Sequence, residues 1–515
     1  MTATNTGNGI MSIHSMANAA VTERGPCRLL PFRRTMPFDE NAVENVLETR
    51  YASAEMARIW SPAFKFGTWR KLWIWLAESE QELGLPITDE QLAELRATAG
   101  TIDFEAAARY EKKLRHDVMA HVHAWGDIAP TAKGIIHLGA TSQFVGCNTD
   151  LIQMRDALRI LKKRLAKAIA SLAKFSEQQK SLPTLGFTHF QPAQPTTVGK
   201  RACTWLQDLV MDYHEVSRLI EWLPFRGVKG TTGTQASFME LFNGDEDRID
   251  ALDRRVTEKA GFSRPLTISG QTYTRHIDSR VLHVLGEIAV SVARMGNDIR
   301  LLQHLKEVEE PFEKDQIGSS AMAYKRNPMR SERMGALSRV ILAQQQVMDS
   351  TAASQWFERT LDDSAAKRIC VSQAFLATDA CLVIAENIAS GLVVYPKMIE
   401  ARLLSELPFM ATENILMQAV KKGGDRQELH ELIRQHSMAA GNVVKMEGKP
   451  NDLLDRLAAD PAFGLDRAQL NSVLDPKLYI GRAPSLVERF LAEEVQPILE
   501  AEKASLAENA VDLKV

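Results

Sequence analysis

The stretch IDSRVLHVLGEIAVSVARMGNDIRLL, residues 277–302, indicates the fold class most directly. Its apolar residues recur at spacings of three and four, which places them on one face of a helix. Such a helix runs for about thirty residues, or roughly 45 Å at 1.5 Å of rise per residue. Helices of this length and spacing pack nearly parallel to one another, as in bundles. The residues that form the stripe are Ile277, Val281, Val284, Ile288, Val292, Met295, Ile299 and Leu302.

Two further stretches, 151–172 and 202–220, repeat this pattern, whereas the alternation typical of β-strands is short wherever it occurs. We interpret the stripes as core packing rather than as a cofactor site. The sequence therefore predicts an all-α fold, with a central long-helix bundle flanked by two smaller helical domains. The predicted parts are a disordered extension over 1–35, a helical domain over 36–141, the bundle over 142–394 and a second helical domain over 395–515.

Composition excludes several functional classes. The chain has 515 residues and a formal net charge of −3, so no overall basic field is available to hold nucleic acid. No run approaches the ~20 apolar residues of a membrane-spanning helix. The five cysteines are odd in number and form no CxxC pair, which favours a reducing compartment, and we expect a cytoplasmic protein.

The first 35 residues are rich in Thr, Asn and Gly and lack sustained periodicity, which predicts disorder. Their arginines leave an organellar transit peptide open as an alternative. Met36 is an alternative start.

Chemistry is expected in the polar, breaker-rich loops between the helices. One contains THFQP (188–192), in which the imidazole of His189 is suited to proton transfer, although a lone histidine is more often structural. Another, GSSAMAYKRNP (318–328), combines a flexible start with two cations and an amide. Such a loop can fold over an anionic ligand, with Lys325 and Asn327 stabilising negative charge. An ordinary phosphate-binding or solvated basic loop is the alternative.

Other motifs are weaker. The segment Arg115-His116-Asp117 is followed by His121, but the two histidines lie about 140° apart on a helix and do not converge on a metal. A phosphate or carboxylate site is favoured there. GVKGTTG (227–233) matches neither a dinucleotide nor a P-loop motif, and no GxSxG elbow for an acyl-transfer serine is present.

At the level of whole motifs, GSSAMAYKRNP resembles the GSSxMPxKxNP loop of the fumarase/aspartase superfamily, with Ala323 where that loop has proline. The stretches LRHDVMAHVH, HLGATS, GFTHFQPAQPTTVGKR, GVKGTTGTQASF and QWFERTLDDSAAKR are similar to the adenylosuccinate lyase family of the animal type. The similarity runs from about Arg50 to about Val495. Alanine at 323 is expected to loosen the loop without removing a reacting group.

This resemblance implies a homotetramer whose active sites are shared between chains. It implies elimination of fumarate from adenylosuccinate to give AMP, and cleavage of the succinyl-carboxamide ribotide (SAICAR) to AICAR in purine synthesis. Small nucleotides are the expected ligands, and no metal, organic cofactor, nucleic acid or membrane partner is expected.

The resemblance also assigns roles to residues. A β-elimination needs a base for the carbon acid and an acid for the leaving nitrogen. These roles fall to Ser319, whose alkoxide Lys325 stabilises, and to His189. Glu332 joins them as a catalytic support for the loop. The predicted substrate-binding residues are Arg50, Tyr51, Arg115, His116, Asp117, Thr141, Ser142, Gln271, Asn327, Arg333, Arg359, Ser364 and Arg368.

Two alternatives remain at this point. The first is another fumarate-releasing lyase of the superfamily, acting on a small amino acid or argininosuccinate. Arg359 and Arg368 argue instead for a nucleotide phosphate. The second is a non-catalytic helical scaffold, against which the joint presence of Ser319, Lys325 and His189 argues.

Overall fold

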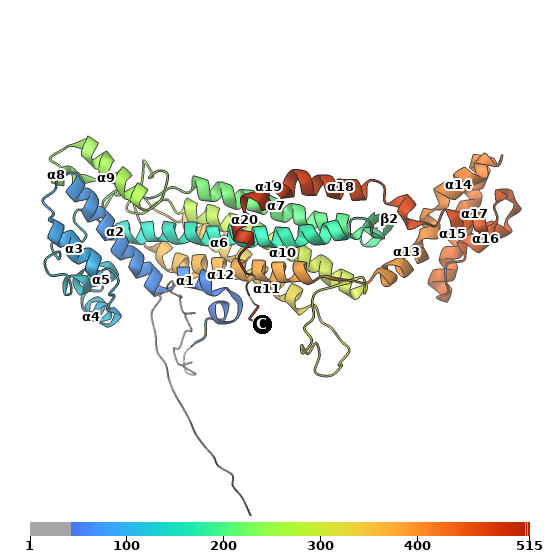
Figure 1. Cartoon of the computed structure of the whole chain (residues 1–515), viewed down its shortest axis with the longest axis horizontal. Helices are drawn as coiled ribbons and strands as arrows, with labels where there is room; N and C mark the ends of the chain where they lie inside the picture. The colour runs from blue at the N-terminus through green and yellow to red at the C-terminus, as the bar shows by residue number, and fades with distance from the viewer. Residues whose placement is uncertain (1–42, 510, 512, 515) are drawn as a thin grey trace, which may run out of the picture. The chain divides into compact units, whose positions relative to one another are not determined.

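Five long helices lie side by side at the centre of the structure (Figure 1). α10 packs against α7, α11 and α12, and α6 packs against α7 and α12. Their bounds are α6 (Ser142–Gln178), α7 (Val198–Trp222), α10 (His276–His304), α11 (Met329–Ala353) and α12 (Asp362–Gly391). The all-α prediction with a central long-helix bundle is confirmed.

The structure is a computed structural model that describes residues 43–509, 511, 513 and 514. The described residues from Asn45 onward belong to one unit. The predicted disordered extension over 1–35 lies outside the described residues.

Local sequence explains where the bundle helices run. The whole apolar stripe of 277–302 lies within α10, and none of its eight apolar residues is more than 7% exposed. α7 begins after Thr197, whose hydroxyl accepts a hydrogen bond from the Lys200 amide at 3.1 Å. It ends before Pro224, because proline disfavours a helical conformation in the residue that precedes it.

Smaller helices gather at the end of the bundle where α6 begins (Figure 1). Their core contains the buried indoles of Trp69, Trp73 and Trp125, and the rings of Trp73 and Trp125 lie 5.9 Å apart. These elements are α2 (Pro62–Glu82), α3 (Asp89–Thr98), α4 (Phe104–Leu114), α5 (Asp117–Gly126), α8 (Ala236–Leu241) and α9 (Glu246–Lys259). The preceding elements η1 (Leu47–Tyr51) and α1 (Ala54–Ile59) pack along the bundle, η1 against α12 and α1 against α6 and α12.

The chain after the bundle forms a second group of helices with its own hydrophobic cluster, which extends from Ala411 to Val473. These elements are α13 (Pro396–Met410), α14 (Thr412–Lys421), α15 (Arg426–Glu447), α16 (Leu453–Ala459), η2 (Pro461–Phe463), α17 (Arg467–Ser472) and η3 (Pro476–Tyr479). The last elements return to α6 and α7 and are α18 (Ala483–Phe490), η4 (Leu491–Val495), α19 (Gln496–Ala501) and α20 (Lys503–Leu506). The predicted domain boundaries at 141/142 and 394/395 stay predictions.

A β-hairpin that the sequence did not predict connects α6 to α7. Strands β1 (Pro183–Thr188) and β2 (Gln191–Thr197) pair antiparallel, with Pro183 opposite Thr197 and Thr188 opposite Gln191. Three prolines fall within these strands, so the composition signals loops rather than strands. A second short pair, β3 (Val308–Glu309) and β4 (Val393–Val394), joins the chain after α10 to the chain after α12.

α12 is long and apolar enough to cross a membrane by length and composition. However, 78% of its most apolar window is buried inside the protein, against α6, α10 and α11. Because α12 is buried among other helices of the protein, its apolarity is that of a core helix.

Candidate active site

The predicted general acid, His189, lies at the tip of the hairpin. The backbone φ angles of His189 and Phe190 are 52° and 57°, and the two residues connect the paired Thr188 and Gln191. Two successive positive φ angles are typical of a type I′ turn, which usually contains Asn or Gly. This turn projects the His189 side chain into solvent, and no other side chain in the described part of the chain donates to it or accepts from it.

The predicted base lies in a loop between β3 and α11, here called the GSS loop (residues 311–328). The Ser319 Oγ accepts hydrogen bonds from the amides of Ala321 and Met322 at 3.3 and 3.1 Å. Such amides stabilise negative charge on the oxygen that they face. The side-chain amide of Asn327 donates to the backbone carbonyl of Gly318 at 2.7 Å and holds the two arms of the loop together. Lys325 is exposed on the same loop.

The two ends of the GSS loop are fixed by Glu310. Its buried carboxylate accepts hydrogen bonds from the Arg330 amide, the Ser331 amide and the Ser331 hydroxyl, each at 2.9 Å. These amides belong to the first turn of α11, which has no other partners for them within the helix. Glu332 follows on this turn and lines a hollow of about 570 Å³ with His304.

A second set of predicted residues lies at the junction of α4 and α5. Arg115 ends α4 with a left-handed φ of 55°, and His116 then caps α5 by accepting the Met119 amide on Nδ1 at 3.3 Å. Because Nδ1 accepts a hydrogen bond, the neutral ring carries its proton on Nε2. Asp117 pairs with Arg368 of α12 at 3.4 Å.

The histidines that follow are structural. The His121 ring is buried and stacks on Phe66 with ring centroids 4.0 Å apart, and burial lowers the pKa of His121 to about 4. His123 stacks on Tyr110 at 5.3 Å. Among the residues that the structure describes, no group of three or more His, Cys, Asp or Glu side chains is placed to hold a metal ion.

Thr141 and Ser142 mark the start of α6. Thr141 is the N-cap residue, yet its hydroxyl accepts no capping hydrogen bond. The first amides of a helix and the helix dipole favour an anion at such a position, so the predicted role of Thr141 and Ser142 in binding a carboxylate stays a prediction.

The predicted residues Gln271 and Arg359 come from two segments that precede α10 and α12. The Arg359 guanidinium donates to the side-chain oxygen of Gln271 at 3.4 Å. The backbone amide of Gln271 donates to the backbone carbonyl of Glu358 at 3.0 Å. Gly270 is required at this crossing, because a Cβ there would lie 2.5 Å from the Glu358 oxygen. Ser364 follows in the first turn of α12.

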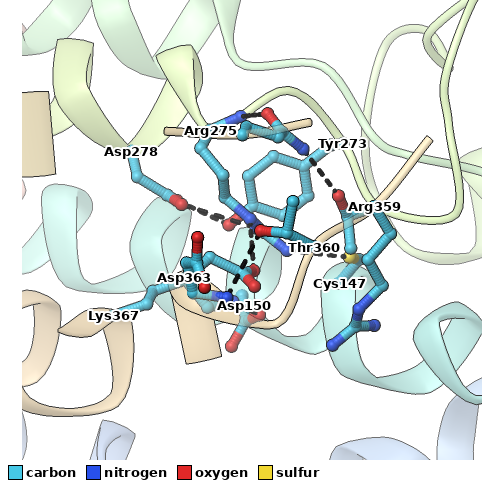
Figure 2. Close-up of polar contacts among 12 residues, drawn as sticks. Cys147, Asp150, Tyr273, Arg275, Asp278, Arg359, Thr360, Asp363 and Lys367 are labelled. Carbon is cyan, nitrogen blue, oxygen red and sulfur yellow. Dashed lines mark hydrogen bonds and ion pairs between the residues drawn. The ribbon is translucent and has the colours of Figure 1, made fainter. Parts of the chain in front are cut away.

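A buried network of charges joins the starts of α10 and α12, next to these two segments (Figure 2). The Arg275 Nε lies 2.7 Å from the Asp363 carboxylate, and the Arg275 Nη1 lies 3.4 Å from Asp278. Tyr273 donates its hydroxyl to Asp278 at 2.5 Å. Burial raises the pKa of Asp278, and the charge of Arg275 opposes that rise.

Arg50 and Tyr51 end the short element η1. The Arg333 guanidinium of α11 lies 5.7 Å from the centroid of the Tyr51 ring, which brings two predicted residues together. Arg50 directly precedes Tyr51 in the sequence, and its side chain is exposed.

The structure thus places the predicted residues in several separate groups. These are the His189 hairpin, the GSS loop with the first turn of α11, the junction of α4 and α5 with Arg368, the start of α6, the Gln271–Arg359 pair and the Tyr51–Arg333 pair. Within the described residues, no hydrogen bond or ion pair joins His189 to Ser319 or Lys325. Sequence reasoning missed the supporting residues Tyr273, Arg275, Asp278 and Asp363. Arg275 and Asp278 flank the start of a strongly apolar helix, and this is the local signal that could have indicated buried charge.

The central bundle of long helices defines an all-α, fumarase-like fold. The fold is similar to that of 3-carboxy-cis,cis-muconate lactonizing enzyme from Pseudomonas putida, with a TM-score of 0.76 and 23% identity over 88% of this chain and 100% of that chain. It is also similar to a fumarate lyase from Mesorhizobium sp. BNC1, with a TM-score of 0.72 and 22% identity over 86% of this chain and 99% of that chain.

Sequence comparison is more specific. The family described as lyase matches residues 91–342, and the family described as adenylosuccinate lyase C-terminus matches residues 408–490. Adenylosuccinate lyase of Saccharomyces cerevisiae is 52% identical over 91% of this chain and 98% of its own length. That of Schistosoma mansoni is 50% identical over 90% of this chain and 98% of its own length. The chain belongs to the adenylosuccinate lyase family.

Proposed function

We propose that this protein eliminates fumarate from adenylosuccinate to give AMP, and cleaves SAICAR to AICAR at the same site, in purine nucleotide synthesis in the cytoplasm. The observation that carries the proposal is the position of Ser319, whose oxygen faces two backbone amides in a loop with Lys325. A serine in this setting is suited to removing a proton from carbon, because the alkoxide that does so is stabilised.

The reaction proceeds by proton transfer and bond cleavage alone. Ser319 takes a proton from the succinyl carbon next to a carboxylate, and the electron pair passes into that carboxylate. The pair then forms the double bond of fumarate as the carbon–nitrogen bond breaks. His189 gives a proton to the leaving nitrogen, so no external oxidant, reductant or water is consumed.

The other groups hold the substrate. Thr141 and Ser142 bind a succinyl carboxylate at the start of α6. Arg333, Arg359 and Arg368, with the Ser364 hydroxyl, bind phosphate and carboxylate oxygens. Asp117 and Gln271 are further contacts of the substrate. Glu332 and Asn327 support the GSS loop. Arg50, Tyr51, Arg115, His116, Arg333, Arg359, Ser364 and Arg368 complete the proposed substrate-binding residues.

We infer a homotetramer with shared sites because one chain leaves both its site and its bundle incomplete. No hydrogen bond or ion pair joins His189 to the GSS loop within the described chain. The bundle helices also carry exposed apolar side chains, including Val290 of α10 at 55% and Val347 of α11 at 42% exposure. Apolar residues in such numbers on long helices are typical of a surface covered by another subunit.

The test is the ultraviolet difference spectrum after adenylosuccinate is added to the purified protein. We expect the absorbance change of conversion to AMP, with fumarate released in equal amount. Argininosuccinate and aspartate serve as controls for the other superfamily activities. Turnover of a control but not of adenylosuccinate would contradict the proposal, and no turnover of any of the three would favour a scaffold.

A further inference from the structure

A cavity of about 280 Å³ lies where α2, α6 and α12 meet, next to the pair that Arg368 forms with Asp117. Its charged lining consists of Lys65, Asp150, Asp278, Lys367 and Arg368. The volume is several times the roughly 30 Å³ that one water occupies in the liquid, so the cavity has room for a polyatomic group. Arg368 already belongs to the proposed substrate-binding residues, which makes the cavity an inward extension of that site.

Most charged groups of this cavity have partners. Lys367 pairs with Asp150, and Arg368 pairs with Asp117 at 3.4 Å. Asp278 is held by Tyr273 and Arg275. Lys65 differs from them, because its ammonium makes no hydrogen bond or ion pair within the part of the chain that the structure describes.

The surroundings of Lys65 hold its ammonium in the cavity wall. Its Nζ lies 5.2 Å from the centroid of the Phe66 ring and 5.3 Å from that of Trp69, so aromatic faces cover part of the side chain. Burial lowers the pKa of Lys65, and the charge of Asp150 acts in the opposite direction. A half-buried cation without a bound anion is costly, so an anion that enters this cavity is bound favourably.

We propose that the Lys65 ammonium, together with Arg368, binds the phosphate of the nucleotide substrate. The inference rests on the proposed function and adds one residue to the substrate-binding set. A lysine ammonium binds phosphate as a point charge, and the arginine beside it supplies directed donors. The succinyl carboxylates are assigned to Thr141 and Ser142 at the start of α6, which leaves the phosphate as the anion for this cavity.

The test compares binding of AMP with binding of adenosine, which lacks the phosphate. K65M keeps the aliphatic stem against Phe66 and Trp69 but removes the charge, whereas K65R keeps the charge. K71M is the matched control, because Lys71 is exposed on the same helix. Dissociation constants are measured by calorimetry on the assembled protein, with melting curves to check folding. K65Q replaces K65M if the methionine variant does not fold.

We expect K65M to weaken AMP binding by about 10- to 100-fold, as loss of a charged hydrogen bond does, and to leave adenosine binding unchanged. K65R and K71M should bind both ligands as the wild type does. Unchanged AMP binding in K65M, or equal weakening of AMP and adenosine, would overturn the assignment. If K65M weakened inhibition by succinate and left AMP binding unchanged, Lys65 would bind a succinyl carboxylate instead of the phosphate. Wild-type turnover of adenylosuccinate tests the proposed function separately, since the binding measurements need no catalysis.

Discussion

His189 is held in a backbone conformation that its residue type rarely adopts. Its φ of 52° and that of Phe190 at 57° lie in the left-handed region. Non-glycine residues there are strained, and such strain is concentrated at functional sites. The turn positions the imidazole away from its own chain, which suits a group that meets a substrate held elsewhere.

Replacing His189 by alanine should lower kcat by about 10²- to 10⁴-fold with little change in KM, because a general acid acts on the leaving nitrogen only in the transition state. Steady-state kinetics with adenylosuccinate measure both constants. His214→Ala on the exposed face of α7 is the control and should behave as the wild type. A large rise in KM with unchanged kcat would make His189 a binding residue.

Glu80 of α2 provides a second test at the residue scale. Its side chain is fully buried, neither carboxylate oxygen has a hydrogen-bond partner in the structure as described, and burial raises the pKa of Glu80 to about 9. The unfolded chain loses this proton near pH 4.5, whereas the folded chain keeps it to about pH 9. Stability therefore falls as the pH rises between these two values.

Glu80→Gln should thus raise the melting temperature relative to the wild type at pH 8, by the equivalent of a few kcal/mol, and much less at pH 5. Thermal denaturation at the two pH values measures the difference. Glu90→Gln on the exposed start of α3 should show no such dependence. An equal shift of both variants would mean that Glu80 is ionised in the folded protein.

At the scale of elements, the long helices were predictable because their signal is local. The stripe over 277–302 needs only its own residues to define the buried face of α10. The supporting charges were not predictable, because they pair across the chain. Asp150 and Lys367 are 217 positions apart, and Arg275 meets Asp363 only when α10 and α12 are already side by side. The hairpin was missed because its prolines suggest a loop.

The candidate site divides in the same way. The GSS loop and the residues near His189 are contiguous motifs, so a resemblance could identify them. The clamp formed by Glu310 and the cavity beside Lys65 have no contiguous motif. Both depend on how an already folded bundle brings distant backbone and side-chain atoms together.

Asp363 links an element to the site, since its pair with Arg275 holds the start of α12 near Gln271 and Arg359. We expect Asp363→Asn to raise KM for adenylosuccinate about tenfold, with a smaller effect on kcat. It should also lower stability by about 3–5 kcal/mol, because Arg275 stays buried with an incomplete set of partners. Kinetics and denaturant unfolding measure the two effects. Asp362→Asn, at the exposed neighbouring position, is the control. Lower stability with unchanged KM would reduce Asp363 to a structural role.

At the scale of the whole molecule, the proposed tetramer makes a quantitative prediction. Ser319→Ala and His189→Ala each inactivate every site of their own assembly. When the two variants are unfolded and refolded together in equal amounts, each site draws its serine and its histidine from different chains. The chance that both are intact is about one half times one half, so roughly a quarter of wild-type activity should return.

The control for this experiment mixes Ser319→Ala with Lys325→Ala. Both residues lie on the GSS loop of one chain, so no mixture of these variants can contain an intact pair, and activity should stay at background. Background activity in verified mixed tetramers of the first pair would contradict shared sites, while the lyase assignment would stand.

The apolarity of α12 has a consequence for how the chain is made. A helix apolar enough for a bilayer is a hazard when it leaves the ribosome, since it can aggregate or be taken for a membrane segment. Its main partners α6, α10 and α11 all precede it in the chain. Synthesis adds about 5–20 residues per second and N-terminal parts fold first, so a surface ready to cover α12 exists when it emerges. A circular permutant that begins at α12 would lose this order, and we expect it to aggregate during translation although its finished fold would be the same.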